Sequence, residues 1–240
     1  MAQKFAVFDI DGTIIRTALF LQIVDELIAR GHLDASHGAV LSEKLEAYRT
    51  RAHQTAFQEY NEAAVKILFD NLSRLKESDY RAAADTVVEH SYRRVYVYTR
   101  KLIESLRVEG YFLIALSGSE QYTIERFTAH YGFDLVIGDH YLTQNGHFTG
   151  KIDSVFHDKG AALKRLVEEH NLDWKQSLGI GDSYGDTKML DLVAHPIAFN
   201  PEAELFEHAS SKGWEIVIER KNVMYRLEPR DGTYILAQAD

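Results

Sequence analysis

Two aspartates, Asp9 and Asp11, stand two residues apart near the start of the chain, in the stretch FDIDGT. An apolar run leads directly into them, and Gly12 follows. Because side chains of a strand alternate between its two faces, both aspartates can lie on the same side of the chain. Two neighbouring carboxylates repel each other, so the cluster predicts a positively charged partner such as a metal ion.

Other polar residues also close short apolar runs. FLIALS ends in Ser117, and SLGIGD ends in Asp182. Runs of this length and composition are typical of buried parallel strands. In such sheets ligands bind where the carboxyl ends of the strands emerge, so these residues are candidates for one shared site.

The residue types suit phosphoryl transfer. A carboxylate such as Asp9 can take up a phosphoryl group as an acyl phosphate. Asp11 would protonate the leaving alkoxide and later activate the hydrolytic water. Asp182 would supply a second carboxylate for Mg²⁺, a hard cation that prefers oxygen ligands. Gly12 would let the chain turn sharply and bring backbone N–H groups near the phosphate.

Four motifs follow one another along the chain: DIDGT at 9–13, LSGS at 116–119, Lys159 in HDKG, and GDSYGD at 181–186. Together they resemble those of the phosphatases of the haloacid dehalogenase (HAD) superfamily, in the phosphoserine phosphatase-like branch with a helical cap after the first strand. A single DxDGT is only modestly specific, whereas all four in order at strand ends are highly specific. The resemblance implies that Mg²⁺ is held by the Asp9 side chain, the Asp11 backbone carbonyl and Asp182.

Four further residues complete the expected site. Ser117 and the Gly118 backbone N–H would hydrogen-bond the phosphoryl oxygens, and Lys159 would neutralise charge in the transition state. Asp186 lies one helical turn beyond Asp182, where it would hold a metal-bound water or position Lys159. Asp182 and Ser183 can equally cap the helix that follows them.

The substrate is harder to predict. Phosphoserine phosphatases usually carry a Glu that binds the substrate ammonium a few residues after DxDGT, whereas this chain has Arg16 and Thr17 there. We therefore expect a substrate without an ammonium group at that place. Arg49 and Arg51 could read a second anionic group from the cap, although a solvated helix face explains them as well.

Other functions fit less well. GIGDSYG at 179–185 resembles a dinucleotide-binding loop, but Asp182 would repel a pyrophosphate, and the motif lies late in the chain. Ser183 lacks the G-x-S-x-G setting of a serine esterase. A non-catalytic anion-binding module would not need two aspartates. Dehalogenation would not need an acid such as Asp11, because a halide leaves without a proton. A phosphotransferase or phosphomutase remains an alternative, because an alcohol can replace water as the acceptor of the phosphoryl group.

The elements predict an α/β fold, namely a doubly wound, mainly parallel Rossmann-like sheet with an inserted helical cap. Residues 15–92 are helical in period and would form the cap; residues 1–14 and 93–240 would form the core. Asn145-Gly146 predicts a hairpin, and Asp231-Gly232 predicts a turn between two strands near the C-terminus. Both strand pairs would extend the edge of the sheet.

Composition narrows the function classes. The 240 residues are 45% hydrophobic and 26% charged, as in an ordinary globular protein. A net charge of -9 disfavours nucleic-acid and membrane-surface partners, and the lack of cysteine excludes disulfides and thiolate catalysis. We therefore expect a cytoplasmic Mg²⁺-dependent phosphomonoester hydrolase that acts on a small phosphorylated metabolite through an aspartyl phosphate.

Overall fold

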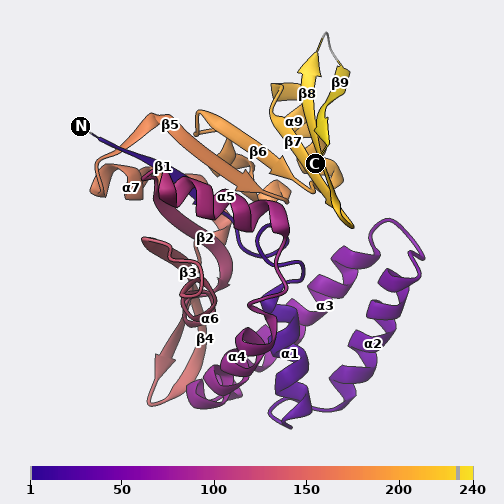
Figure 1. The fold of residues 1–240 in the computed structure, drawn as a ribbon. Helices are drawn as coiled ribbons and strands as arrows, with labels where there is room; N and C mark the ends of the chain where they lie inside the picture. Colours follow the sequence, from indigo (N-terminus) through magenta and orange to yellow (C-terminus); the bar gives the residue numbers. More distant parts are fainter. Residues whose placement is uncertain (1, 231–232, 240) are drawn as a thin grey trace. The chain divides into compact units, whose positions relative to one another are not determined.

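The computed structural model describes residues 2–230 and 233–239 of the chain. It divides into two compact units. The sheet unit comprises residues 1–16, 92–139 and 154–240, and the helical unit comprises residues 17–91 and 140–153. Figure 1 shows the strands and helices of both.

The sheet unit is built on a mainly parallel sheet. Its strands lie in the order β3-β2-β1-β5-β6-β7-β8-β9. Pairing is parallel from β3 to β7 and antiparallel from β7 to β9. These strands are β1 (Gln3–Phe8), β2 (Phe112–Glu120), β3 (Leu135–Gln144), β5 (Leu172–Gly181), β6 (His195–Phe199), β7 (Glu215–Arg220), β8 (Val223–Arg230) and β9 (Thr233–Ala239).

Helices alternate with these strands along the chain, as the sequence predicts. They are α5 (Val97–Val108), α6 (Gln121–Thr128), α7 (Lys159–Glu169), α8 (Thr187–Leu190) and α9 (Ala203–Lys212), with short 3₁₀ turns η2 (Phe156–Asp158) and η3 (Tyr184–Asp186). The predicted doubly wound α/β fold is confirmed by this order. The interior is apolar: Phe5, Val7, Ile114 and Leu116 of the two central strands are fully buried.

The register of the central strands brings the predicted site residues to one edge. Phe8 of β1 pairs with Ala115 of β2 on one side and Ile180 of β5 on the other. Asp9, Ser117 and Asp182 each come one or two residues after these paired positions, so they lie near one level of the sheet. Asp9 follows β1 directly, and its backbone N–H donates to the Ile180 carbonyl at 3.0 Å.

The helical unit follows the first strand in the chain. Its helices are α1 (Leu19–Ala29), α2 (Ser36–Arg49), α3 (Ala56–Asn71), η1 (Leu72–Arg74) and α4 (Glu77–Ser91). It also contains a hairpin, formed by the end of β3 and by β4 (His147–Asp153). The turn of this hairpin is the predicted Asn145-Gly146 pair, and both residues have positive φ, 52° and 76°.

The hairpin packs on helices through aromatic rings. The Tyr80 ring of α4 lies 5.9 Å from that of Tyr141 and 5.4 Å from that of Phe148, between ring centroids. Residues 140–153 therefore cluster with the helices, while β4 also pairs with β3 at the edge of the sheet, as the sequence predicts for this hairpin. The proposed cap range, 15–92, stays a prediction.

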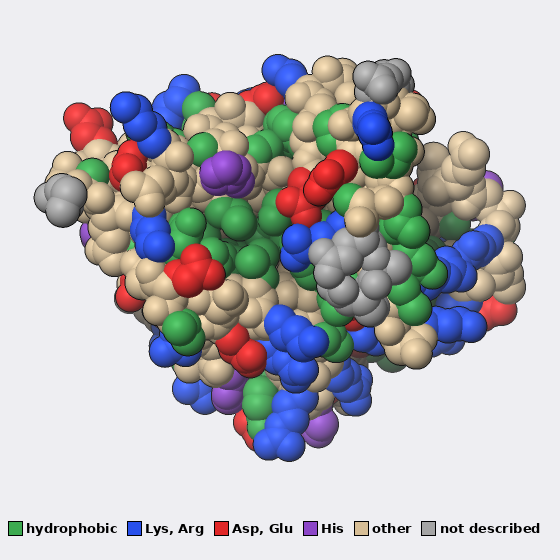
Figure 2. All heavy atoms as spheres, turned by 45° about the horizontal axis from the view of Figure 1, so that its top comes forward, with side chains coloured by type: hydrophobic (Ala, Val, Ile, Leu, Met, Phe, Trp, Pro, Cys, Tyr) green, Lys and Arg blue, Asp and Glu red, His purple; other side chains and the backbone are tan. Residues whose placement is uncertain are grey.

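The C-terminal strands β8 and β9 pair antiparallel, as expected of the tail. The predicted Asp231-Gly232 turn lies outside the described residues. Within residues 2–230 and 233–239, no helix is both long and apolar enough to span a membrane. On the face drawn in Figure 2, acidic, basic and hydrophobic side chains are interspersed.

Candidate active site

Lys159 is the centre of a buried ion-pair network. It begins α7, is 2% exposed, and its Nζ donates to Asp9 Oδ1 at 2.6 Å and to Asp186 Oδ1 at 2.7 Å. Burial by itself lowers the pKa of this lysine, but the carboxylates of Asp186 and Asp9 outweigh burial and raise it above its usual value. Lys159 therefore stays positively charged throughout the neutral range.

Both carboxylate oxygens of Asp186 accept hydrogen bonds. While Oδ1 accepts from Lys159, Oδ2 accepts from the backbone N–H and the hydroxyl of Ser183, each at 3.0 Å. The contact with the Ser183 N–H is one half of a capping box at the start of η3, in which the Ser183 side chain also accepts from the Asp186 backbone. Because protein donors already occupy both oxygens, the geometry suits the positioning of Lys159 better than direct metal ligation.

Asp182 follows β5 and lies against the turn after β1. Its Oδ1 accepts from the Thr13 hydroxyl at 3.0 Å. Gly12 has φ +81°, and a Cβ at this position would lie 2.0 Å from Asp182 Oδ2. Only glycine leaves room for the carboxylate here, because any side chain would overlap it.

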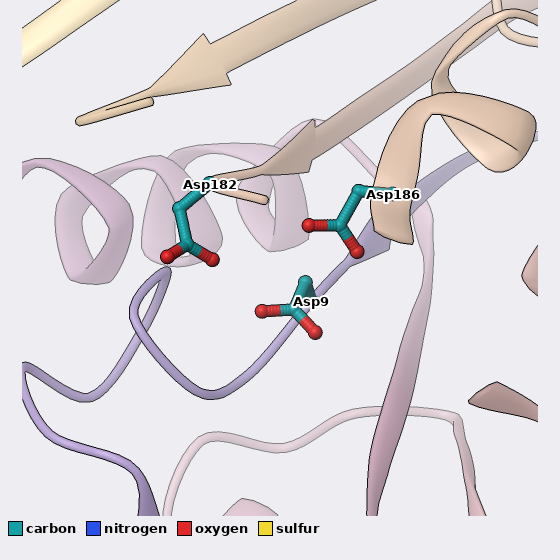
Figure 3. A group of neighbouring side chains, drawn as sticks. All are labelled: Asp9, Asp182 and Asp186. Carbon is teal, nitrogen blue, oxygen red and sulfur yellow. The ribbon is translucent and has the colours of Figure 1, made fainter. Parts of the chain in front are cut away.

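Three carboxyl groups converge in this region, as Figure 3 shows. One oxygen from each of Asp9, Asp182 and Asp186 lies within 4.8 Å of the others. Burial, reinforced by the charges of Asp186 and Asp11 and partly offset by Lys159, raises the pKa of Asp9 to about 7. Burial and the negative charge of Asp9 likewise raise the pKa of Asp182 well above its usual value.

Asp9 and Asp182 thus bring negative charge into a buried region, where Lys159 is a neighbouring cation. A donor set made of carboxylate oxygens fits a hard divalent cation, which would supply further positive charge. The residues present therefore fit a metal site at Asp9 and Asp182.

Asp11 contacts the end of β2. Its Oδ2 accepts from the Ser119 hydroxyl at 2.6 Å and from the Ser117 hydroxyl at 3.3 Å. Ser117 Oγ in turn accepts from the Ser119 backbone N–H at 3.0 Å. Gly118, between them, is partly exposed. Ser117 and Ser119 thus join β2 to the turn that carries the two aspartates.

Arg16 belongs to the sheet unit, and Arg49 and Arg51 belong to the helical unit. Arg16 Nη2 lies 3.3 Å from Glu219 Oε1, an ion pair with the arginine half-exposed and the glutamate buried. Arg49 is the last residue of α2, and Arg51 follows in the loop; both are exposed and belong to the helical unit. Their role in specificity stays a prediction.

Two residues of the site escaped the sequence analysis. Thr13 is fully buried and donates to Asp182, although no catalytic role was assigned to it. Ser119 lies inside LSGS, but only Ser117 and Gly118 were selected from that motif. The alternation of strand side chains was the available signal, since it places Ser119 on the same face as Ser117.

Comparison with known proteins agrees with the motifs. The family model described as haloacid dehalogenase-like hydrolase matches residues 6–191. A histidinol-phosphatase of Neisseria meningitidis serogroup C is 27% identical over 224 residues, which cover 90% of this chain and 98% of that protein. A phosphoserine phosphatase of Archaeoglobus fulgidus is 24% identical over 208 residues, 85% of this chain and 54% of that protein.

Solved structures share the fold. A protein of unknown function from Bordetella pertussis Tohama I superposes with a TM-score of 0.72 at 19% identity, covering 91% of this chain and 99% of that one. A phosphoserine phosphatase, solved as a phospho-aspartyl intermediate analogue, gives a TM-score of 0.61 at 16% identity, covering 92% and 95%. At these identities the likeness supports the fold alone.

Proposed function

Because the chain belongs to the family of haloacid dehalogenase-like hydrolases, we propose that it is a Mg²⁺-dependent phosphomonoesterase that acts through an aspartyl phosphate. The observation that carries this proposal is the contact of Asp9 with Lys159 at 2.6 Å, in a group of carboxylates suited to a metal. The names of the relatives, both phosphatases, also support it.

In the proposed first step, an Asp9 carboxylate oxygen forms a bond to phosphorus while the bond from phosphorus to the ester oxygen breaks. Asp11 gives its proton to that departing oxygen. In the second step Asp11 takes a proton from water, whose oxygen attacks the phosphorus and releases Asp9 and inorganic phosphate.

The other residues would bind the phosphoryl group and balance its charge. Lys159 keeps a positive charge beside the nucleophile, while the Ser117 hydroxyl and the Gly118 N–H would donate to phosphoryl oxygens. Asp9, the Asp11 backbone carbonyl and Asp182 would hold Mg²⁺. When bound, Mg²⁺ supplies the positive charge that offsets the carboxylates and the phosphoryl oxygens.

The test is hydrolysis of 4-nitrophenyl phosphate by wild type and by Asp9→Asn, with Mg²⁺ or with EDTA. We expect Asp9→Asn to lower kcat by about 10³-fold or more, and EDTA to abolish turnover. Asp70→Asn is the matched control, because Asp70 is an exposed aspartate on α3. Equal turnover by wild type and Asp9→Asn would exclude the aspartyl phosphate.

For the substrate, we propose a small phosphorylated metabolite, with histidinol phosphate tested first. The relative named for it aligns over nearly its whole length, whereas the phosphoserine phosphatase aligns over about half of its own. A higher kcat/KM for phosphoserine than for histidinol phosphate would reverse this choice.

Water and an alcohol are both possible phosphoryl acceptors. The alternative of a phosphotransferase predicts that added alcohols lower phosphate release while substrate consumption continues. A cytoplasmic location and the helical cap at 15–92 stay predictions alongside this function.

A further inference from the structure

We propose that Ser119 is a positioning residue for Asp11, whose carboxyl group it holds in place for proton transfer. This inference rests on the proposed function, since it concerns the acid and base of that reaction. Ser119 lies near the end of β2 and is 5% exposed. None of the roles described above includes its side chain.

The two hydrogen bonds that serine hydroxyls donate to Asp11 differ in length, and the difference supports this role. The Ser119 hydroxyl donates to Asp11 Oδ2 at 2.6 Å, whereas Ser117 donates to the same oxygen at 3.3 Å. The shorter bond has the length of a strong bond from a hydroxyl to a carboxylate. Ser119 is therefore the principal partner of that oxygen among these two hydroxyls.

The two serine hydroxyls can have different roles, because each has a single hydrogen to donate. A serine hydroxyl has one hydrogen and can donate only one hydrogen bond at a time. If Ser117 turns its hydrogen to a phosphoryl oxygen, it can no longer donate to Asp11. Ser119 can keep the carboxyl of Asp11 oriented during that change.

The segment around Ser119 is well anchored. The next residue, Glu120, caps α6: its carboxylate accepts from the backbone N–H groups of Tyr122 at 3.1 Å and Thr123 at 3.0 Å. The Ser119 N–H itself donates to Ser117 Oγ. A buried hydroxyl group on a well-anchored strand can hold a neighbouring side chain more precisely than a hydroxyl group on a mobile segment can.

The consequence concerns the leaving group. Asp11 must pass its proton to the ester oxygen when an alkyl phosphate is cleaved, because a free alkoxide is a very poor leaving group. A 4-nitrophenolate departs with little need of a proton. Loss of the Ser119 hydroxyl should therefore slow cleavage of an alkyl phosphate more than cleavage of 4-nitrophenyl phosphate.

The experiment compares wild type, Ser119→Ala and Ser119→Thr on 4-nitrophenyl phosphate and on an alkyl phosphate that wild type hydrolyses. We expect Ser119→Ala to lower kcat/KM, which reports the step that releases the leaving group, by at least about 10-fold more for the alkyl ester than for the aryl ester, since general acid catalysis contributes about 10²- to 10⁴-fold. Ser119→Thr keeps the hydroxyl and should restore most of the loss.

Equal losses on both esters, or a loss that Ser119→Thr does not restore, would overturn the positioning role while leaving the phosphatase intact. Crystal structures of wild type and Ser119→Ala give a readout that needs no activity. The Asp11 carboxyl should change its rotamer or lose order in the variant, and an unchanged position would also overturn the role. Wild type that hydrolyses no phosphate ester would contradict the proposed function, and the crystal structures would then decide the role of Ser119 alone.

Discussion

At the scale of single residues, Asp9 has conflicting surroundings. Lys159 donates to it at 2.6 Å, yet burial and the other carboxylates outweigh that contact and raise the pKa of Asp9 to about 7 from 3.8. A divalent cation beside Asp9 would remove the conflict, because it favours the ionised form.

This conflict predicts how stability depends on pH. Folded Asp9 binds its proton more tightly than unfolded Asp9, so its stabilising contribution is complete below about pH 4 and is lost as pH rises through about 7. In EDTA, this group should therefore lower the free energy of unfolding across that range. Mg²⁺ competes with the proton, so the increase in Tm that it causes should grow with pH.

Calorimetry from about pH 5 to about pH 8, with Mg²⁺ and with EDTA, measures both effects. The asparagine of Asp9→Asn cannot ionise, so in this variant the Mg²⁺-induced increase in Tm should depend less on pH. A Mg²⁺-induced change in Tm that is the same at every pH would contradict the prediction.

Thr13 leads to a second prediction at this scale. Its buried hydroxyl donates to Asp182 Oδ1 and favours the ionised carboxylate. Thr13→Val removes the donor with little change in size, and we expect the Mg²⁺ concentration for half-maximal activity to rise about 10-fold or more. Titration of 4-nitrophenyl phosphate hydrolysis with Mg²⁺ measures it. Thr13→Ser should stay near wild type; equal effects of the Val and Ser variants would argue for packing instead.

At the scale of elements, the turn after β1 depends on Gly12. Both its φ of +81° and the 2.0 Å approach to Asp182 Oδ2 oppose a side chain. Gly110, after α5, has almost the same φ, +80°, but nothing lies within 4 Å of its Cβ position. An alanine at Gly110 would therefore cause backbone strain alone, whereas an alanine at Gly12 would cause the same strain and a steric clash with Asp182.

We expect Gly110→Ala to lower the free energy of unfolding by about 1–2 kcal/mol, the cost of a left-handed conformation, and to leave activity unchanged. Gly12→Ala should lower the free energy of unfolding by more than Gly110→Ala does. It should also lower kcat, because Asp182 has to move. Urea unfolding and hydrolysis of 4-nitrophenyl phosphate measure the two variants. If Gly12→Ala keeps full activity, the close approach is not needed for function.

At the scale of the whole molecule, the chain forms two units, one of which includes a hairpin distant in sequence from its helices. Tyr80, which is 1% exposed, joins α4 to that hairpin through Tyr141 and Phe148. The helical unit therefore has an aromatic cluster of its own.

We predict that Tyr80→Ala speeds amide hydrogen exchange in α4 and in residues 140–153, while β1 and β5 keep most of their protection. Loss of a buried aromatic ring costs about 3–5 kcal/mol, and units with separate cores can open separately. Exchange measured by mass spectrometry tests this. Phe57→Ala is the control, because Phe57 is 46% exposed. Faster exchange throughout the sheet would show that the two units unfold together.

Much of the arrangement follows from local patterns. Short apolar runs between helical segments predict a parallel sheet, and the polar residues that close these runs must lie at its carboxyl edge. Asp9, Asp182 and Ser117 are found there for that reason. The Asn145-Gly146 turn is likewise local, because its residues tolerate positive φ.

What the sequence by itself determined is therefore the fold class, the family motifs and the edge of the sheet where they meet. Only the tertiary structure decided which hydroxyls hold which carboxylates: Thr13 and Asp182 are 169 positions apart, and Ser119 and Asp11 are 108 apart. It also decided that the hairpin at the sheet edge packs on α4. The physical reason is that a hydrogen bond or a ring contact depends on the folded path of the chain, whereas periodicity and turn chemistry depend on near neighbours.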